Sequence, residues 1–226
     1  MRLFSYCIPI DDGAAPNPYF EICTLAICKP VIRRVANVGD WVVGVGSKNV
    51  QGIDYSGKLV YAMKVTDKMT IKEYDEFCRK ELVGKIPNVY SSNYVEKVGD
   101  CIYDYGSNND GKLRPSVHNL GNRETDLGGI NVLLSTHFYY FGNNAIAIPA
   151  HLTEIIKQGQ GHKSDSNDYL RLSFLEWIEN LGLTINHLYG SPQIRVEFKQ
   201  NAEDGSNTCL IRCKSDMEDE EIEANC

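Results

Sequence analysis

The chain has 226 residues, of which 42% are hydrophobic and 23% charged, with a formal net charge of −7. Such a chain can bury a sizeable core, which excludes a protein that stays disordered throughout. No apolar run reaches the roughly 18 residues of a transmembrane helix, and the opening residues MRLFSYCIPIDD lack the apolar core of a signal peptide. We therefore expect a cytoplasmic protein that makes no contact with a membrane.

The acidic charge is concentrated at the end of the sequence. The last twelve residues, SDMEDEEIEANC, contain six of the 30 acidic residues and no Lys or Arg. The remaining chain is nearly neutral, so the net charge does not exclude a nucleic-acid partner, which needs only a local basic patch. We predict one domain over residues 1–214 and a disordered acidic tail over residues 215–226. The tail could add solubility, cover a basic groove or dock a protein partner.

Eight cysteines are spread along the sequence. Because no export signal is visible, we expect reduced thiols rather than disulfides. The pairs Cys23/Cys28 and Cys209/Cys213 lack the two-residue gap of a zinc knuckle, and the five histidines lack metal-ligand spacing. We therefore predict no metal and no cofactor.

The first third of the sequence has the pattern of β-strands. Leu3 to Ile10 forms an apolar run before Asp11, and β-rich runs follow over residues 41–45 and 59–65. The last two are separated by a glycine-containing loop and predict a long hairpin. The segment VIRRVA lies between the first two runs and leads into the turn at Gly39 and Asp40.

Helices are expected in two places. Thr70 and Glu73 form a capping box in front of apolar residues at helical spacing, and Gly84 ends that pattern. A second apolar helix face extends over residues 169–181. The long polar segment from 90 to 123 predicts a loop, which in a compact domain is usually functional or disordered. Further strands are expected at 131–141, 145–148 and 194–198. The predicted fold class is α+β.

Some motifs match a known site only in part. Gly52 to Lys58 fits most of a phosphate-binding P-loop, but Leu59 replaces the Ser or Thr, and a strand rather than a helix follows. We interpret it as a hairpin loop. His118 and His162 lie in polar, glycine-containing loops, where functional groups tend to sit.

One stretch combines cations with a large aromatic residue. Guanidinium groups bind phosphate through two hydrogen bonds, and aromatic faces stack on bases. If Arg33 and Arg34 lie in an extended segment, they point to opposite faces, so only one can serve a groove directly. Trp41 could be a stacking platform or a core residue that anchors the barrel. The stretch comprises Lys29, Arg33, Arg34, Trp41 and Lys48.

Several separated motifs give the chain a resemblance to a known family. The run GAAPNPYFEICTLAICKPVIRRVANVGDWVVGVGSK, then GKLVYAMKVTDKMTIKEYDEF, GDCIYDY and VLLSTHFYYFGNNAIAIP, occur in this order over residues 1–165. They resemble the nucleotide modification associated domain 2 family. The valine-rich strand after the Gly39–Asp40 turn also resembles PUA-like barrels, including the EVE type.

The family resemblance implies association with systems that modify DNA bases. The PUA-like resemblance implies a mixed β-barrel with two or three flanking helices and a pocket for an altered base. The positions that match the family's signature are Asn17, Thr24, Lys29, Arg33, Arg34, Gly39, Asp40 and Trp41.

Three functions remain open at this point. The first is recognition of modified nucleotides or nucleic acid through a basic and aromatic pocket that includes the signature positions, Lys48 and His118. The second is an enzyme that acts on a nucleotide or base, because acid–base or nucleophilic chemistry needs titratable groups in one pocket. The third is an interaction protein that uses its tail. Candidates for the chemistry are Asp11, Asp12, Cys23, Asp40, Asp100 and His118.

Overall fold

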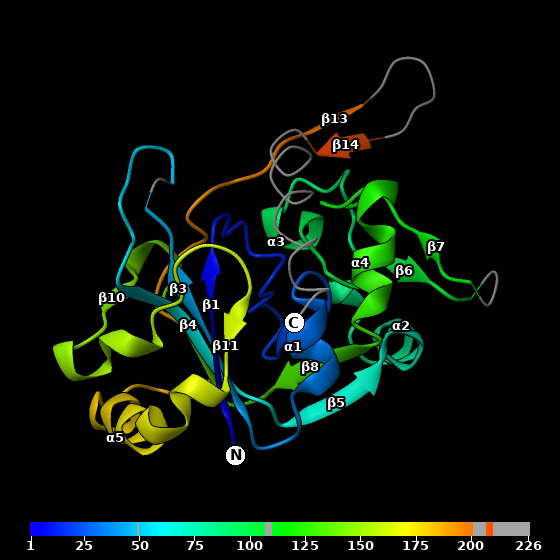
Figure 1. Ribbon diagram of the computed structural model, residues 1–226. Coiled ribbons are helices and arrows are strands. Elements are labelled where there is room, and N and C mark those ends of the chain that lie inside the picture. Colours follow the sequence, from blue (N-terminus) through cyan, green and yellow to red (C-terminus); the bar gives the residue numbers. More distant parts are fainter. Residues whose placement is uncertain (49, 107–109, 201–206, 210–226) are drawn as a thin grey trace.

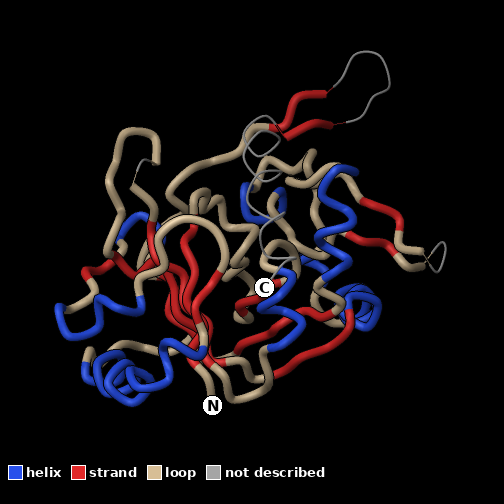
Figure 2. Tube along the Cα trace, in the orientation of Figure 1, coloured by secondary structure: helices blue, strands red, loops and turns tan. Residues whose placement is uncertain are grey.

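The computed structural model describes residues 1–48, 50–106, 110–200 and 207–209. The acidic tail over 215–226 and Cys213 lie outside the described residues. Figure 1 shows two groups of strands with helices around them, and Figure 2 shows the same arrangement by secondary structure.

The largest sheet has seven strands and is mixed. Strand β1 (Leu3–Ile8) runs parallel to β3 (Trp41–Gly46), and β3 pairs antiparallel with β4 (Lys58–Lys64). The predicted hairpin of β3 and β4 is therefore confirmed. The other strands of this sheet are β9 (Phe138–Tyr140), β10 (Ile146–Ala147), β11 (His162–Lys163) and β12 (His187–Leu188).

The predicted α+β class is confirmed, but the predicted barrel is not. The sheet follows the order β11-β1-β3-β4-β9-β12, with β10 paired to β4. Within the described part of the chain, the two ends of this path do not pair with each other. The sheet is therefore open, and a PUA-like barrel remains unconfirmed.

The strands of this sheet bury both faces, because successive side chains of a strand point to opposite sides. One face, which includes Leu3, Trp41 and Val43, packs against the 3-10 helix Ala150–Ile155 and the helix α5 (Arg171–Asn180). The other face, which includes Phe4, Tyr6 and Val42, packs against the second group of strands. In Figure 1, α5 and α1 lie on opposite sides of β1.

The second group is a three-stranded antiparallel sheet in the order β2-β8-β5. Its strands are β2 (Cys23–Leu25), β5 (Asp67–Thr70) and β8 (Asn131–Ser135). Around it lie α1 (Pro30–Val35), α2 (Ile71–Lys80), α3 (Tyr94–Lys97), α4 (Arg123–Gly128) and the pair β6 (Tyr103–Asp104) and β7 (Lys112–Leu113). The remaining elements are the 3-10 helices Val83–Lys85, Leu120–Asn122, Gly142–Asn144 and Asp165–Leu170 and the strand pair β13 (Phe198–Gln200) and β14 (Asn207–Cys209).

The local sequence signals correctly predicted the two long helices. Helix α2 begins with the predicted capping box, in which Thr70 accepts from the Glu73 backbone N–H and Glu73 accepts from that of Thr70. Two predictions differ from the structure: the 90–123 region contains α3, β6 and β7 rather than loop alone, and residues 194–197 form no strand. VIRRV forms helix α1, which was not predicted, so the extended segment considered for Arg33 and Arg34 does not occur.

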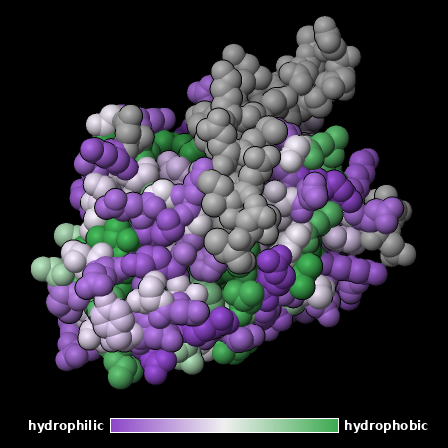
Figure 3. All heavy atoms as spheres, viewed as in Figure 1, coloured by the Kyte–Doolittle hydropathy of each residue, from purple (hydrophilic) through white to green (hydrophobic). Residues whose placement is uncertain are grey.

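The face shown in Figure 3 mixes hydrophilic and hydrophobic side chains. No helix in the described part of the chain has both the length and the hydropathy needed to cross a bilayer.

Candidate functional site

Cys28 occupies an unusual backbone position directly before helix α1. Its φ is 58° and that of Lys29 is 44°, so two successive non-glycine residues adopt the left-handed conformation. Each such residue costs about 1–3 kcal/mol and persists only where its surroundings hold it. Strain of this kind is concentrated at functional sites in proteins, which directs attention to what holds Cys28.

Two side chains hold the peptide groups of Cys28. Its backbone N–H donates to Asp126 Oδ1 at 3.1 Å, and its carbonyl oxygen accepts from Arg33 Nε at 2.7 Å. The buried Arg33 guanidinium also donates to the carbonyl oxygens of Asn131 at 3.0 Å and Asp126 at 2.5 Å. Arg33 therefore joins the loop before α1 to the segment that contains α4 and the start of β8.

The thiol of Cys28 lies beside an imidazole that is itself bonded to a carboxylate. His118 Nε2 is 3.5 Å from Cys28 Sγ, and His118 Nδ1 is 2.7 Å from Asp126 Oδ2. The same order of thiol, imidazole and carboxylate is found in cysteine enzymes, where the three groups are the nucleophile, its base and the group that orients the base. His118 and Asp126 are buried whereas Cys28 is half-buried, so the thiol is the most accessible member of this triad.

The environment of Asp126 keeps it ionised. Burial alone would raise the pKa of this carboxyl, but the charge and hydrogen bond of His118, the charge of Arg33 and the Cys28 N–H together lower the pKa below its usual value. An ionised Asp126 favours a proton on Nδ1 of His118, so when the imidazole is in its neutral form it is Nε2 that carries the lone pair facing the thiol. Tyr103 strengthens this arrangement, since its hydroxyl donates to Asp126 Oδ2 at 3.1 Å.

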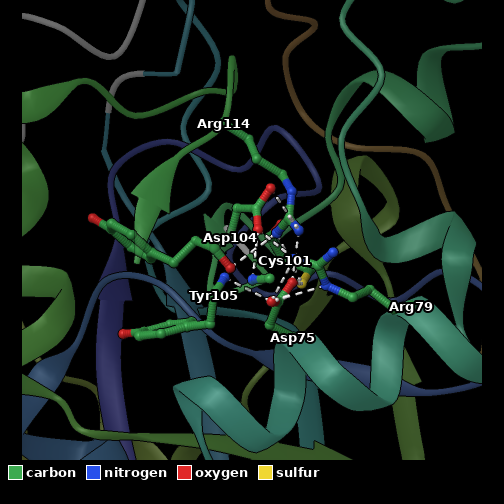
Figure 4. A network of polar contacts seen from close by, with 8 residues as sticks. Asp75, Arg79, Cys101, Asp104, Tyr105 and Arg114 are labelled. Atoms are coloured by element: carbon green, nitrogen blue, oxygen red, sulfur yellow. Dashed lines mark hydrogen bonds and ion pairs between the residues drawn. The ribbon is translucent and has the colours of Figure 1, made fainter. Parts of the chain in front are cut away.

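A second polar network fixes the segment that carries Tyr103 (Figure 4). Asp75 on α2 accepts from Arg79 Nη2 at 2.9 Å and from Arg114 Nη2 at 2.6 Å, while Arg114 Nη1 donates to the Tyr103 carbonyl at 2.9 Å. Burial would raise the pKa of Asp75, but these arginines and the Tyr105 N–H lower it. The network attaches β6 and the segment leading to His118 to helix α2.

A cleft of about 710 Å³ is lined in part by Lys29, the residue after Cys28 in the chain. Lys29 Nζ lies 5.3 Å from the centroid of the Tyr6 ring, a cation–π distance. Lys48 and Lys157 also line the cleft, and Asp54 is the one acidic residue in its lining. Cys28 itself is not among the lining residues.

Two members of the predicted basic and aromatic cluster lie elsewhere, which corrects the expected recess. Arg33 is fully buried and donates to the carbonyl oxygens of Cys28, Asn131 and Asp126. Trp41 is 3% exposed and packs against His137 and Phe174. Neither can meet a phosphate or stack on a base in this conformation. Arg34 is exposed and donates to the Gly128 carbonyl at 3.0 Å, so the structure brings only Lys29 and Lys48 together at a cleft.

Asn17 and Thr24 take part in a separate buried network. The ammonium of Lys85 donates to Asn17 Oδ1 at 2.7 Å and to Thr24 Oγ1 at 2.9 Å, and Thr24 donates to Asp100 Oδ2 at 2.5 Å. Burial lowers the pKa of Lys85 and raises that of Asp100, while the charge of each opposes the effect on the other. All four side chains are fully or almost fully buried, so this network holds the loop before β2 and does not face solvent.

The remaining candidates are dispersed. Asp40 accepts from the backbone N–H groups of Arg2 and Asn37 at the turn before β3. Asp11 accepts from the Tyr140 hydroxyl, Asp12 from the Ala14 N–H, and the pKa of the buried Cys23 rises to about 12, mainly through desolvation. His118 is therefore the one predicted catalytic candidate that the structure places in the triad.

The sequence alone does not mark Cys28 and Asp126 as members of a site. Cys28 stands out in it only as half of a possible zinc pair, and nothing distinguishes Asp126 from the other acidic residues. The pair Lys29–Pro30 was the signal that could have identified Cys28, because Pro favours the first position of a helix and a cysteine just before a helix is a frequent nucleophile position.

Comparison with known proteins gives one match. The family model described as nucleotide modification associated domain 2 matches residues 1–201. No curated protein and no solved structure matches the chain.

Proposed function

The chain belongs to the nucleotide modification associated domain 2 family, and on this premise we propose that it is a cysteine-dependent enzyme that transfers or hydrolyses an acyl group on a nucleotide or base. The observation that supports this proposal is a series of two contacts. Cys28 Sγ lies 3.5 Å from His118 Nε2, and His118 Nδ1 lies 2.7 Å from Asp126 Oδ2. The reaction class follows from the side chains present, since a thiol next to an oriented imidazole forms thioesters.

The proposed reaction has two steps. The Cys28 sulphur attacks the carbonyl carbon of the substrate while its proton passes to His118 Nε2, and the departing amine or alcohol then takes that proton. The acyl group is now a thioester on Cys28. Water or an amine attacks the same carbon, loses a proton to His118, and the thiol is regenerated with that proton.

Alkylation of individual cysteines tests the proposal. Cys7 is the control, because it is half-buried and outside any disulfide like Cys28, and it lines the cleft but has no part in the triad. We expect iodoacetamide to modify Cys28 at neutral pH at least about tenfold faster than Cys7, since general-base assistance contributes at least that factor. The His118→Asn variant should remove the difference, as measured by mass spectrometry of the separated peptides. Equal rates at the two cysteines, unchanged by His118→Asn, would contradict the proposal.

Recognition of a modified nucleotide without chemistry is the second candidate. The lysine-lined cleft favours it, because a cleft of this kind can bind an anion whether or not Cys28 reacts. The two functions differ in how they depend on the thiol. A Cys28→Ala variant that keeps the full function of the protein in a cell would favour recognition.

A further inference from the structure

The cleft that Lys29 lines lies where two parallel strands end. Because β1 and β3 are parallel, their carboxyl ends meet at one edge of the sheet, and ligands of α/β sheets bind at such edges. Cys7 and Pro9 enter the lining from the end of β1, and Gly46 to Lys48 enter from the end of β3. Figure 1 shows the chain between the 3-10 helix 150–155 and β11 crossing over this edge, and its residues 156–160 complete the lining.

The lining has the chemistry of a phosphate site. Its charged residues are three lysines, Lys29, Lys48 and Lys157, and one acid, Asp54. Lysine is a compact point charge that binds phosphate without a fixed geometry. Small residues, which let a ligand approach the backbone closely, make up much of the rest. They are Gly46, Ser47, Ser56, Gly57 and Gly159.

The same lining has no aromatic ring, so it offers no platform for a base. Lys29 links the cleft to the reacting thiol, because it lines the cleft and directly follows Cys28. A ligand that binds among the lysines therefore contacts the residue next to Cys28 in the chain. The volume of about 710 Å³ is that of a site for one small molecule.

We propose that the substrate of Cys28 is a phosphorylated mononucleotide whose phosphate groups bind among Lys29, Lys48 and Lys157. This proposal rests on the proposed function, since it names the substrate class of the same site. A site for a mononucleotide differs from a site for a nucleic-acid strand, because the strand needs cations and stacking rings along an extended groove.

Binding of defined ligands by calorimetry tests the proposal. The probes are pyrophosphate, a set of deoxynucleoside mono- and diphosphates, the matching nucleosides and a short oligothymidylate. Nucleotides and pyrophosphate should bind, nucleosides should bind at least about tenfold more weakly, and affinity should fall as salt is added. Lys48→Gln and Lys157→Gln should each weaken binding by about tenfold, because each removes one charge from the phosphate site. Lys80→Gln, which removes an exposed charge on α2, should have no effect.

Each other result overturns the proposal. Nucleosides that bind as tightly as nucleotides, or a double variant of Lys48 and Lys157 that binds unchanged, would show that the lysines hold no phosphate. Binding of the oligothymidylate alone would assign the cleft to nucleic acid instead.

The Cys28→Ala variant separates failure of this proposal from failure of the proposed function. If Cys28 proves unreactive while lysine-dependent nucleotide binding persists in Cys28→Ala, the enzymatic function fails and the phosphate site remains. If Cys28 reacts as proposed but no phosphorylated probe binds, only the phosphate site fails.

Discussion

Asp126 Oδ1 accepts a 3.1 Å hydrogen bond from the backbone N–H of Cys28, although 98 positions separate the two residues. The other oxygen of the same carboxylate accepts from His118 at 2.7 Å. One side chain therefore sets the position of both the nucleophile and its base. This double contact explains how the strained loop that contains Cys28 keeps a defined distance to His118, which comes from a distant segment of the chain.

Replacing Asp126 by Asn tests this double contact. An amide has one accepting oxygen, so Asp126→Asn can keep the bond from Cys28 or the bond from His118, but not both. It also removes the charge that holds the imidazole in the required tautomer. We expect Cys28 alkylation by iodoacetamide at neutral pH to fall at least about tenfold.

Asp126→Glu is the comparison, because it keeps the charge and both oxygens but lengthens the side chain. It should retain more reactivity than Asp126→Asn if charge and tautomer matter most. A reactivity of Asp126→Asn equal to that of the wild type would show that Asp126 does not orient His118.

Two adjacent glycines provide a matched test of Arg33. A Cβ on Gly129 would overlap sterically with the Arg33 guanidinium, whereas a Cβ on Gly128 would have no neighbouring atom within 4 Å. Gly129→Ala therefore displaces a buried guanidinium from its carbonyl partners, and we expect a loss of roughly 1–3 kcal/mol in the free energy of unfolding. Gly128→Ala should change it by less than about 0.5 kcal/mol. Urea unfolding of both variants measures the difference, and equal effects would contradict the role given to Arg33.

Local patterns in the sequence were enough to predict much of the main fold. The alternating run of β4 and the capping box at Thr70 specify their elements within a few residues of chain, and the structure contains both. Helix α1 was missed because two adjacent arginines and β-branched neighbours do not show a helical period. Its conformation depends on Arg33, which bonds to residues almost a hundred positions away.

The triad could not be predicted for the same physical reason. His118 comes from a loop-rich segment and Asp126 from a short helix, and their distance to Cys28 depends on packing that no local pattern encodes. The polar loop around His118 marked it as a functional position, whereas Asp126 looked like one of many surface acids. For Trp41 the sequence left two interpretations open, a stacking platform or a core residue, and only the core residue agrees with the structure, because the sheet face on which Trp41 lies is covered by α5.

Trp41 should therefore affect stability and not ligand binding. Its ring packs edge-on against His137 at 5.3 Å and Phe174 at 5.8 Å between centroids. Trp41→Phe removes buried contacts, and we expect a loss of about 1–3 kcal/mol in the free energy of unfolding. Nucleotide affinity, measured by calorimetry on the folded variant, should stay unchanged. An affinity loss without a loss of stability would restore the stacking interpretation.

Asp11 should make the stability of the fold depend on pH. Desolvation by burial raises the pKa of this carboxyl from 3.8 to about 7, with a further contribution from the charge of Asp12 and an opposing one from the Tyr140 hydroxyl. Between these two values the folded protein keeps the proton on Asp11 and the unfolded chain has lost it. The folded state therefore binds more protons, and its stability falls by up to about 1.4 kcal/mol for each pH unit of rise until the pH passes about 7.

The Asp11→Asn variant isolates this contribution, because the amide cannot ionise but can still accept from Tyr140. We expect its free energy of unfolding, relative to the wild type, to rise by a few kcal/mol between about pH 5 and about pH 8. Urea unfolding of both proteins across this range measures the difference, and all other titrating groups cancel in it. A difference that stays constant with pH would show that Asp11 ionises as easily in the folded protein as in the unfolded chain. Burial would then leave the pKa of Asp11 unchanged, and the hydrogen bonds that Asp11 accepts from Tyr140 and Gln193 would have to offset the whole cost of desolvation.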